Sequence, residues 1–197
     1  PYSGKKTGGY GAAAGLSYPS DSRAFKASVT IDGALLPKPE SDTGRRQVKS
    51  TGLLAWTLSE NWLLESRLVV RLRNYDSNRT DLRTDATWNR GTWTVKGRLN
   101  GVHDGGFGIL GYLEGGWKPS RGAVWLRFTG FGIPSWQARI YCYERDAPGN
   151  FTSPAYYGTG FSAMAYAGWK KRLGKTDFKL YLRGSYTRQK EKPRQAG

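Results

Sequence analysis

Apolar and polar residues alternate with a period of two along most of the chain. In the stretch 62–73, WLLESRLVVRLR, one set of alternate positions is almost wholly apolar and the other carries three arginines. Residues two positions apart share a face of a β-strand, so this pattern predicts a strand with one apolar and one basic face. The stretch 51–58 before it is also apolar, and Ser-Glu-Asn at 59–61 predicts the turn of a hairpin.

The same period recurs in about ten segments, which predicts an antiparallel up-and-down meander between residues 8 and 188. Residues 1–7 and 189–197 are polar and are expected to be a loose N-terminal segment and a tail. Long polar connections are expected at 35–47 and 131–158. No helical period appears, and no apolar run approaches the ~20 residues of a membrane helix.

Short turns and longer loops alternate along this meander, and aromatic residues gather beside the short turns. Indole rings favour the headgroup level of a bilayer, where the ring is in contact with lipid and its N–H stays hydrated. The pattern therefore predicts an all-β fold, a transmembrane antiparallel β-barrel that is part of a larger barrel. The segment 137–143 is expected to extend as a strand beyond the membrane. The predicted interfacial girdle consists of Trp56, Trp62, Trp88, Trp93, Trp117, Trp125, Trp169 and Phe178.

Composition agrees with such a barrel more readily than with a water-soluble sandwich that buries tryptophan in its core. Only 38% of the residues are hydrophobic, although 14% are aromatic. A barrel that presents every second side chain to lipid needs fewer aliphatic residues than a soluble core does. A sandwich would also leave the position of the tryptophans beside the turns unexplained.

The net charge of +16 is expected to concentrate inside the barrel, on its rim and in its outer loops. A charge facing lipid costs about 2–4 kcal/mol at the bilayer midplane, so basic strand residues should face the lumen. Two interpretations remain open: a cationic lumen that favours anionic solutes, or an interior of ion pairs and water around a plug. Acidic candidates for the lumen are Asp32, Glu65, Asp85 and Glu114. The basic candidates are Lys26, Arg67, Arg71, Arg73, Arg83, Lys96, Arg98, Lys179 and Arg183.

Nucleic-acid binding is the alternative use of so many basic residues. Binding of single strands needs aromatic and basic side chains on one face, and here they alternate on opposite faces. This alternation disfavours nucleic acid as a partner of this segment. Basic loop residues are instead expected to contact the phosphates of lipopolysaccharide, and the candidates are Lys38, Arg45, Arg46 and Arg145.

Catalytic chemistry has little support in the sequence. His103 is the single histidine and precedes Asp104, a pair that could act as a general base in a membrane enzyme, although Asp-Gly-Gly is more typical of a turn. Cys142 is the single cysteine, so it can form neither an intrachain disulfide nor a zinc site alone. No phosphate loop, metal spacing or nucleophile elbow is present, and no catalytic residue, metal or cofactor is assigned.

Two stretches resemble a known family. ARIYCYERD at 138–146 and SPAYYGTG at 153–160 are similar to a pattern near the end of large Bacteroidota outer-membrane proteins, and LSENW at 58–62 resembles one of their hairpins. Those proteins carry helix-hairpin-helix modules before a C-terminal barrel, and this chain has no such modules. The sequence begins at Pro1 without a signal peptide and lacks the final strand ending in an aromatic residue that such barrels usually have. It is therefore expected to be a mature or truncated fragment with strands missing at both ends. The resemblance implies a barrel of poorly defined activity that can be one part of a larger envelope assembly.

Together these features predict a non-enzymatic barrel in the Gram-negative outer membrane, acting as a pore or transport component or as a subunit of an envelope assembly. Expected partners are outer-membrane lipid, lipopolysaccharide, other outer-membrane proteins and lipoproteins. A membrane enzyme and a basic nucleic-acid-binding β protein are the alternatives.

Overall fold

The computed structural model describes residues 10–19, 24–36, 45–174 and 176–190, and these form strands, turns and loops. The predicted loose segment 1–7 and residues 191–197 of the predicted tail lie outside this part of the chain. Across the described residues, no helix is long and apolar enough to cross a membrane. The strands are β1 (Tyr10–Pro19), β2 (Phe25–Leu36), β3 (Arg45–Ser59), β4 (Trp62–Arg73), β5 (Arg79–Arg90), β6 (Trp93–His103), β7 (Phe107–Trp117), β8 (Gly122–Ile133), β9 (Ile140–Tyr141), β10 (Ala155–Tyr156), β11 (Gly158–Leu173) and β12 (Thr176–Gln189).

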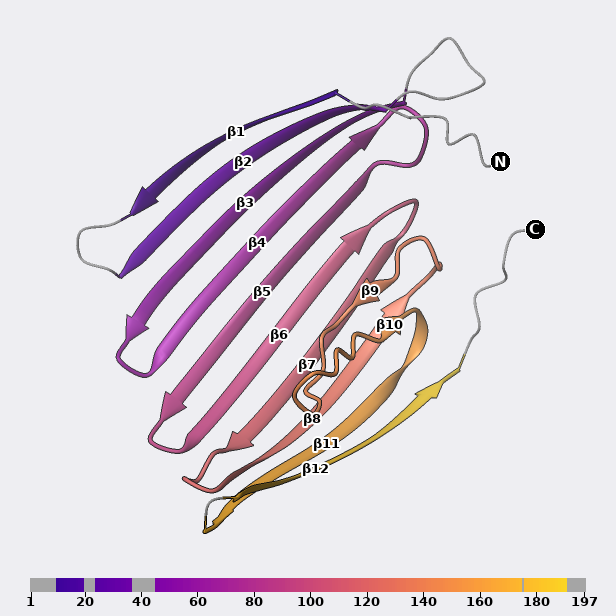
Figure 1. Ribbon diagram of the computed structural model, residues 1–197. Helices are drawn as coiled ribbons and strands as arrows, with labels where there is room; N and C mark the ends of the chain where they lie inside the picture. The colour runs from indigo at the N-terminus through magenta and orange to yellow at the C-terminus, as the bar shows by residue number, and fades with distance from the viewer. Residues whose placement is uncertain (1–9, 20–23, 37–44, 175, 191–197) are drawn as a thin grey trace, which may run out of the picture.

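Ten of these strands form one antiparallel sheet in the order β1-β2-β3-β4-β5-β6-β7-β8-β11-β12. Strands β1 to β7 each pair with the next strand in the chain, and β8 pairs with β11 across the connection that contains β9 and β10, which confirms the predicted meander. The sheet is not closed: β1 and β12 do not pair with each other. It curves strongly, and the short hairpin of β9 and β10 lies on its concave side (Figure 1).

The turns follow from local sequence. The predicted turn at 59–61 joins β3 to β4, with a register shift between Thr57 and Ser59. Gly91 joins β5 to β6 with a φ of 58°, a left-handed conformation that glycine adopts without steric cost. Both turns lie at the end of the sheet where Trp62 pairs with Trp88.

Two predicted loops differ from the observed fold. Residues 35–47 were expected to form one long loop, but β2 continues to Leu36 and β3 begins at Arg45, with these two residues paired. Backbone hydrogen bonds extend the ladder past the apolar stretch because they do not require apolar side chains. The connection 134–157 does not extend away from the sheet: it folds back over it, and only Ile140–Tyr141 of the predicted strand 137–143 is a strand.

The two faces of the sheet have different environments. The inner face is the face that carries Asp85 and Glu114. The outer face is the opposite one, which carries Leu113 and Phe128. Along β7 and β8 the alternation is complete: Glu114 is 1% exposed and its neighbour Leu113 is 59% exposed. The apolar core lies between the inner face and the folded-back connection, and it contains Val102, Leu110, Tyr112, Phe131, Ile133, Ala138, Ile140, Cys142 and Tyr156.

The aromatic row beside the short turns is present on the outer face, with one correction. Trp93 packs against Trp117 at 6.1 Å between ring centroids, and Trp169 packs against Phe178 at 6.2 Å. Trp56 and Trp62 are exposed on the same face, and Trp88 pairs with Trp62.

The assignment of Trp125 to this row is wrong, because it is buried on the inner face. Its cross-strand partner is Gly116, where a Cβ atom would lie 2.3 Å from the indole ring. The missing side chain of Gly116 leaves the space that the indole ring occupies.

Candidate functional site

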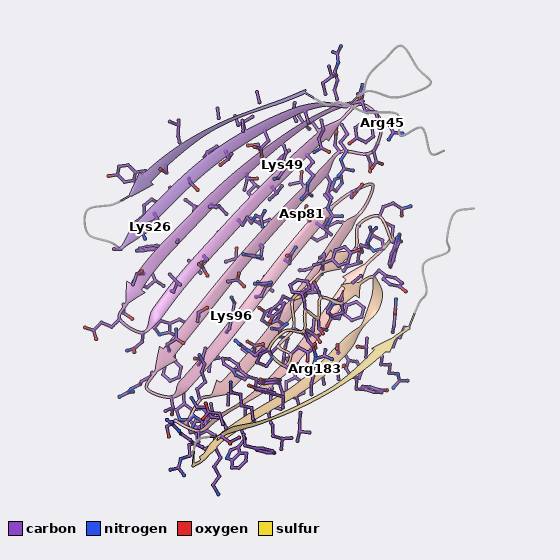
Figure 2. The ribbon with its side chains drawn as sticks, viewed as in Figure 1. Lys26, Arg45, Lys49, Asp81, Lys96 and Arg183 are labelled. Atoms are coloured by element: carbon purple, nitrogen blue, oxygen red, sulfur yellow. The ribbon has the colours of Figure 1, made fainter. Side chains whose placement is uncertain are left out.

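The inner face is the candidate functional surface because it gathers nearly all the charged strand residues. Strand register places all nine predicted basic residues on it, from Lys26 in β2 to Arg183 in β12. Figure 2 shows Lys26, Lys49, Asp81, Lys96 and Arg183 distributed across the sheet. The acidic candidates Asp32, Glu65, Asp85 and Glu114 lie on the same face. The predicted sidedness of the strands therefore agrees with the observed register.

The connection 134–157, which we call the inner loop, lies over this face and forms hydrogen bonds or ion pairs with β5, β6, β7, β8 and β12. Glu114 of β7 binds Arg127 of β8, with Nε and Oε2 2.9 Å apart, and Arg145 of the inner loop, with Nη2 and Oε1 3.0 Å apart. The Arg145 guanidinium also lies 3.3 Å from the centroid of the Trp125 ring. Glu114 thus joins the sheet to the loop through two arginines, one of which stacks on indole.

A second buried carboxylate, Glu144, belongs to the inner loop itself and attaches the loop to the sheet. It forms an ion pair with Arg183 of β12 and accepts a hydrogen bond of 2.6 Å from the Tyr156 hydroxyl. Arg183 also donates to the carbonyl of Arg145 at 3.2 Å. Burial, together with the hydrogen bond to Glu144, raises the pKa of Tyr156 above its ordinary value, so the hydroxyl stays a donor.

Two arginines of the sheet also donate hydrogen bonds to backbone carbonyls of the inner loop. Arg127 donates to the carbonyl of Tyr143 at 2.6 Å. Arg79 of β5 donates to the carbonyls of Gln137 and Arg139 at 2.8 and 3.0 Å. These bonds satisfy loop carbonyls that face the sheet, which is how an irregular segment can be buried there.

Asp85 is the most highly shared carboxylate of the inner face. It is 1% exposed and lies within ion-pair distance of three cations. Arg98 is closest, with Nε and Oδ1 2.6 Å apart; Arg83 follows at 3.1 Å and Lys96 at 3.6 Å. One buried negative charge therefore stabilises a row of three positive ones on adjacent strands.

Cys142 lies at the centre of the loop contact and is buried. Its Sγ atom is 3.9 Å from Nη1 of Arg98 and 3.8 Å from Nη1 of Arg127. Burial raises the pKa of the thiol, although both arginines act in the opposite direction. A neutral thiol fits this position as a small apolar group.

The His103–Asp104 pair is not assembled into a catalytic arrangement. His103 is exposed at the end of β6, while the Asp104 side chain is buried, hydrogen-bonded to Ser77 and 3.8 Å from Nη1 of Arg79. The carboxylate is thus engaged in holding the 74–78 connection. Among the described residues, no three His, Cys, Asp or Glu side chains gather in a group that could hold a metal.

The residues predicted to contact lipopolysaccharide have different surroundings. Arg145 lies on the inner side of the sheet, against Glu114 and Trp125, with 36% of its side chain exposed, and its contact with lipopolysaccharide stays a prediction. Arg45 lies at the end of β3 with its guanidinium 5.3 Å from the centroid of the Tyr75 ring, and Arg46 is exposed beside it. Lys38 lies outside the described residues.

Sequence reasoning missed the inner loop as part of the site. The sequence feature that could have revealed it is a period of two along 138–144. In the structure Ala138, Ile140, Cys142 and Glu144 are buried, while Tyr141 and Tyr143 are exposed. The same stretch carries the family resemblance noted above. A scan against protein-family models found no match, and searches of curated proteins and of solved structures found none either. The resemblance therefore stays a prediction.

Proposed function

We propose that this chain is a section of a transmembrane β-barrel of the Gram-negative outer membrane, where it serves as a non-enzymatic transport component with a constricted, cationic lumen. The observation that carries this proposal is the exposure of large apolar side chains all along the outer face. Leu99, Phe128 and Leu182 are each more than 60% exposed on three different strands. Monomeric soluble proteins rarely expose a continuous apolar surface of this extent.

The open edges of the sheet support a barrel that contains further strands. Unpaired N–H and C=O groups at the edges of β1 and β12 would each cost several kcal/mol in hydrocarbon. Strands from the same protein or from another copy would pair with both edges and close the wall. The aromatic row at one end of the sheet then lies at a lipid–water interface.

The inner loop supports a restricted path rather than a wide channel. It occupies the inner face over several strands and is held there by two buried carboxylates, Glu114 and Glu144. Arg79 of β5 bonds to this loop, whereas the described basic residues of β2, β3 and β4 form no ion pair with it, which would favour anionic solutes in the remaining space.

A subunit of an envelope assembly is the second candidate, favoured by the same two free edges. An edge strand is a template for pairing with another chain. In either role the expected partners are outer-membrane lipid, lipopolysaccharide, and other outer-membrane proteins or lipoproteins.

Fractionation of native membranes tests the proposal. The full-length protein should sediment with the outer membrane, resist extraction by high salt and alkali, and dissolve in detergent. A cytosolic protein and a peripheral membrane protein carried through the same steps serve as controls. Recovery of the folded protein in buffer without detergent would contradict a membrane barrel.

A further inference from the structure

Two pairs of arginines lie directly opposite each other on the inner face of β4 and β5. In the register of these strands Arg71 is paired with Arg79, and Arg67 is paired with Arg83. Like charges directly opposite each other destabilise a sheet unless an anion lies between them. The two pairs differ in whether the chain supplies that anion.

The Arg71–Arg79 pair has its own carboxylate. Asp81 lies on the same face and binds both residues, with its Oδ2 2.8 Å from Nη1 of Arg71 and its Oδ1 2.8 Å from Nη2 of Arg79. The mutual repulsion of the two guanidinium groups is thereby offset within the protein.

The Arg67–Arg83 pair has no equivalent carboxylate between its members. Arg83 lies 3.1 Å from Asp85, but Asp85 is shared with Lys96 and Arg98. Arg67 forms no ion pair among the described residues, and its Nε atom is buried there without a hydrogen-bond partner. A buried donor left unpaired costs free energy that a bound acceptor would recover.

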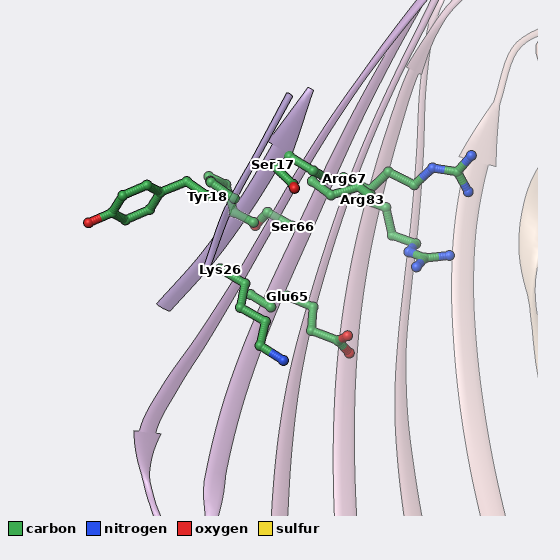
Figure 3. A pocket seen from close by; sticks show the side chains of 12 residues that line it. Ser17, Tyr18, Lys26, Glu65, Ser66, Arg67 and Arg83 are labelled. Atoms are coloured by element: carbon green, nitrogen blue, oxygen red, sulfur yellow. The ribbon is translucent and has the colours of Figure 1, made fainter. Parts of the chain in front are cut away.

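Glu65, the carboxylate next to this pair on β4, is directed elsewhere. Figure 3 shows Arg67 and Arg83 extending to the same side of the sheet, while the end of the Glu65 side chain lies apart from their guanidinium groups. Glu65 also lies directly opposite Asp85 in the register. Glu65 therefore forms no ion pair with Arg67 of the kind that Asp81 forms with Arg71.

A pocket of about 280 Å³ opens onto all four arginines. Ile140 and Tyr141 of the inner loop form its other wall, and Asp81 is the single carboxylate in its lining. Arg79 also lies 3.8 Å from Asp104 and Arg83 lies 3.1 Å from Asp85. Because Asp85 is shared with Lys96 and Arg98, the four guanidinium groups still leave a local excess of positive charge. Arginine binds phosphoryl oxygens in a bidentate geometry, and a phosphate dianion matches an excess of more than one charge.

We propose that Arg67 and Arg83 bind the phosphoryl group of a small soluble solute in this pocket, at the edge of the inner loop. The phosphoryl oxygens bridge Arg67 and Arg83 in the same way that the carboxylate of Asp81 bridges Arg71 and Arg79. The pocket opens on the inner face, away from the apolar outer face, so the phosphate belongs to a solute rather than to a lipid headgroup. The inference names a substrate class for the proposed transport role and rests on an inner face that is accessible to water.

Calorimetric titration of the full-length protein in detergent with inorganic phosphate tests the site, with chloride buffers of equal ionic strength to screen non-specific attraction. Wild-type protein should bind phosphate, and acetate should bind more weakly. Arg67→Gln should weaken phosphate binding by about tenfold or more, because it removes charge-assisted hydrogen bonds. Arg90→Gln removes one positive charge from an exposed position at the end of β5, outside the lining of this pocket, and should bind phosphate as wild type does.

Thermal unfolding without phosphate provides a second readout. Arg67→Gln should unfold at the same temperature as wild type or higher, because it relieves repulsion from Arg83 and breaks no ion pair. Equal phosphate affinity in wild type and Arg67→Gln, equal weakening by Arg90→Gln, or equal binding of acetate would each overturn the proposal. Absence of phosphate binding in wild-type protein that still fractionates with the outer membrane would reject this site alone and leave the proposed barrel standing.

Discussion

Glu114 of β7 accepts two hydrogen bonds from the guanidinium group of Arg145 in the inner loop, at 3.2 Å from Nε and 3.0 Å from Nη2. The carboxylate is 1% exposed. It joins a strand in the middle of the sheet to a connection that sequence reasoning expects to project away from it. The interior of this protein is therefore organised by ion pairs between the sheet and its longest loop.

Replacing Glu114 with Gln should destabilise the fold strongly. The substitution leaves Arg127, 4% exposed, without its carboxylate, and removing one partner of a buried ion pair costs about 3–5 kcal/mol. The free energy of unfolding in detergent or lipid measures the effect. Asp32→Asn is the matched control, since its half-exposed pair with Lys49 at 3.6 Å should be worth about 0–1 kcal/mol. Equal costs for the two variants would show that the Glu114 cluster does not fix the loop.

Cys142 should report whether the inner loop is in place. Burial restricts access and raises the pKa of the thiol, so at a given pH less reactive thiolate is present and alkylation should begin only at higher pH than for a free cysteine. The rate of labelling by iodoacetamide against pH measures this. Tyr141→Cys in a Cys142→Ala background places the thiol at an exposed neighbouring position and should label rapidly. Similar rates at both positions would mean that the loop is not packed on the sheet.

In the barrel that we propose, removal of the inner loop should widen the path for solutes. Ile133 and Gly158 are directly paired where β8 and β11 meet, so a short Gly-Ser turn can replace residues 134–157 without moving the strands. Single-channel conductance of the full-length protein in planar bilayers should rise in this variant. Unchanged conductance would contradict a constriction formed by the loop and would favour the assembly role.

His103→Ala should leave both stability and any membrane activity unchanged. The imidazole is exposed, and surface substitutions of this kind usually alter stability by less than about 0.5 kcal/mol. Assays of lipid and peptide hydrolysis in intact outer membranes compare the variant with wild type. A hydrolytic activity that disappears with His103 would restore the membrane-enzyme alternative.

The wall of the fold could be predicted from the sequence because it depends on local pattern. The period of two along 62–73 gives β4, and the polar turn at 59–61 gives the hairpin to β3. Both patterns involve only residues close together in the chain, so they can be recognised without knowing any tertiary contact. The same period also separates the basic face from the apolar face.

The contents of the inner face could not be predicted in the same way. Whether Arg145 points outward or toward Glu114 depends on a long-range contact between residues that lie far apart in the chain. Trp125 faces inward because Gly116 on the next strand leaves room for its ring, which is a property of the register and not of Trp125. The weak two-residue period of 138–144 became interpretable only when its partner surface was known.

One pair of substitutions in β12 tests the sidedness that supports the whole proposal. Leu182 and Ser185 are both exposed in the same strand, Leu182 on the outer face and Ser185 on the inner face. The free energy of unfolding from a lipid bilayer should fall by about 2–4 kcal/mol in Leu182→Arg, because the charge would enter hydrocarbon near the middle of the strand. Ser185→Arg should change it by less than about 1 kcal/mol, because its charge would meet water in the lumen. Equal, small effects of both substitutions would mean that each face meets water, and the membrane barrel would have to be abandoned.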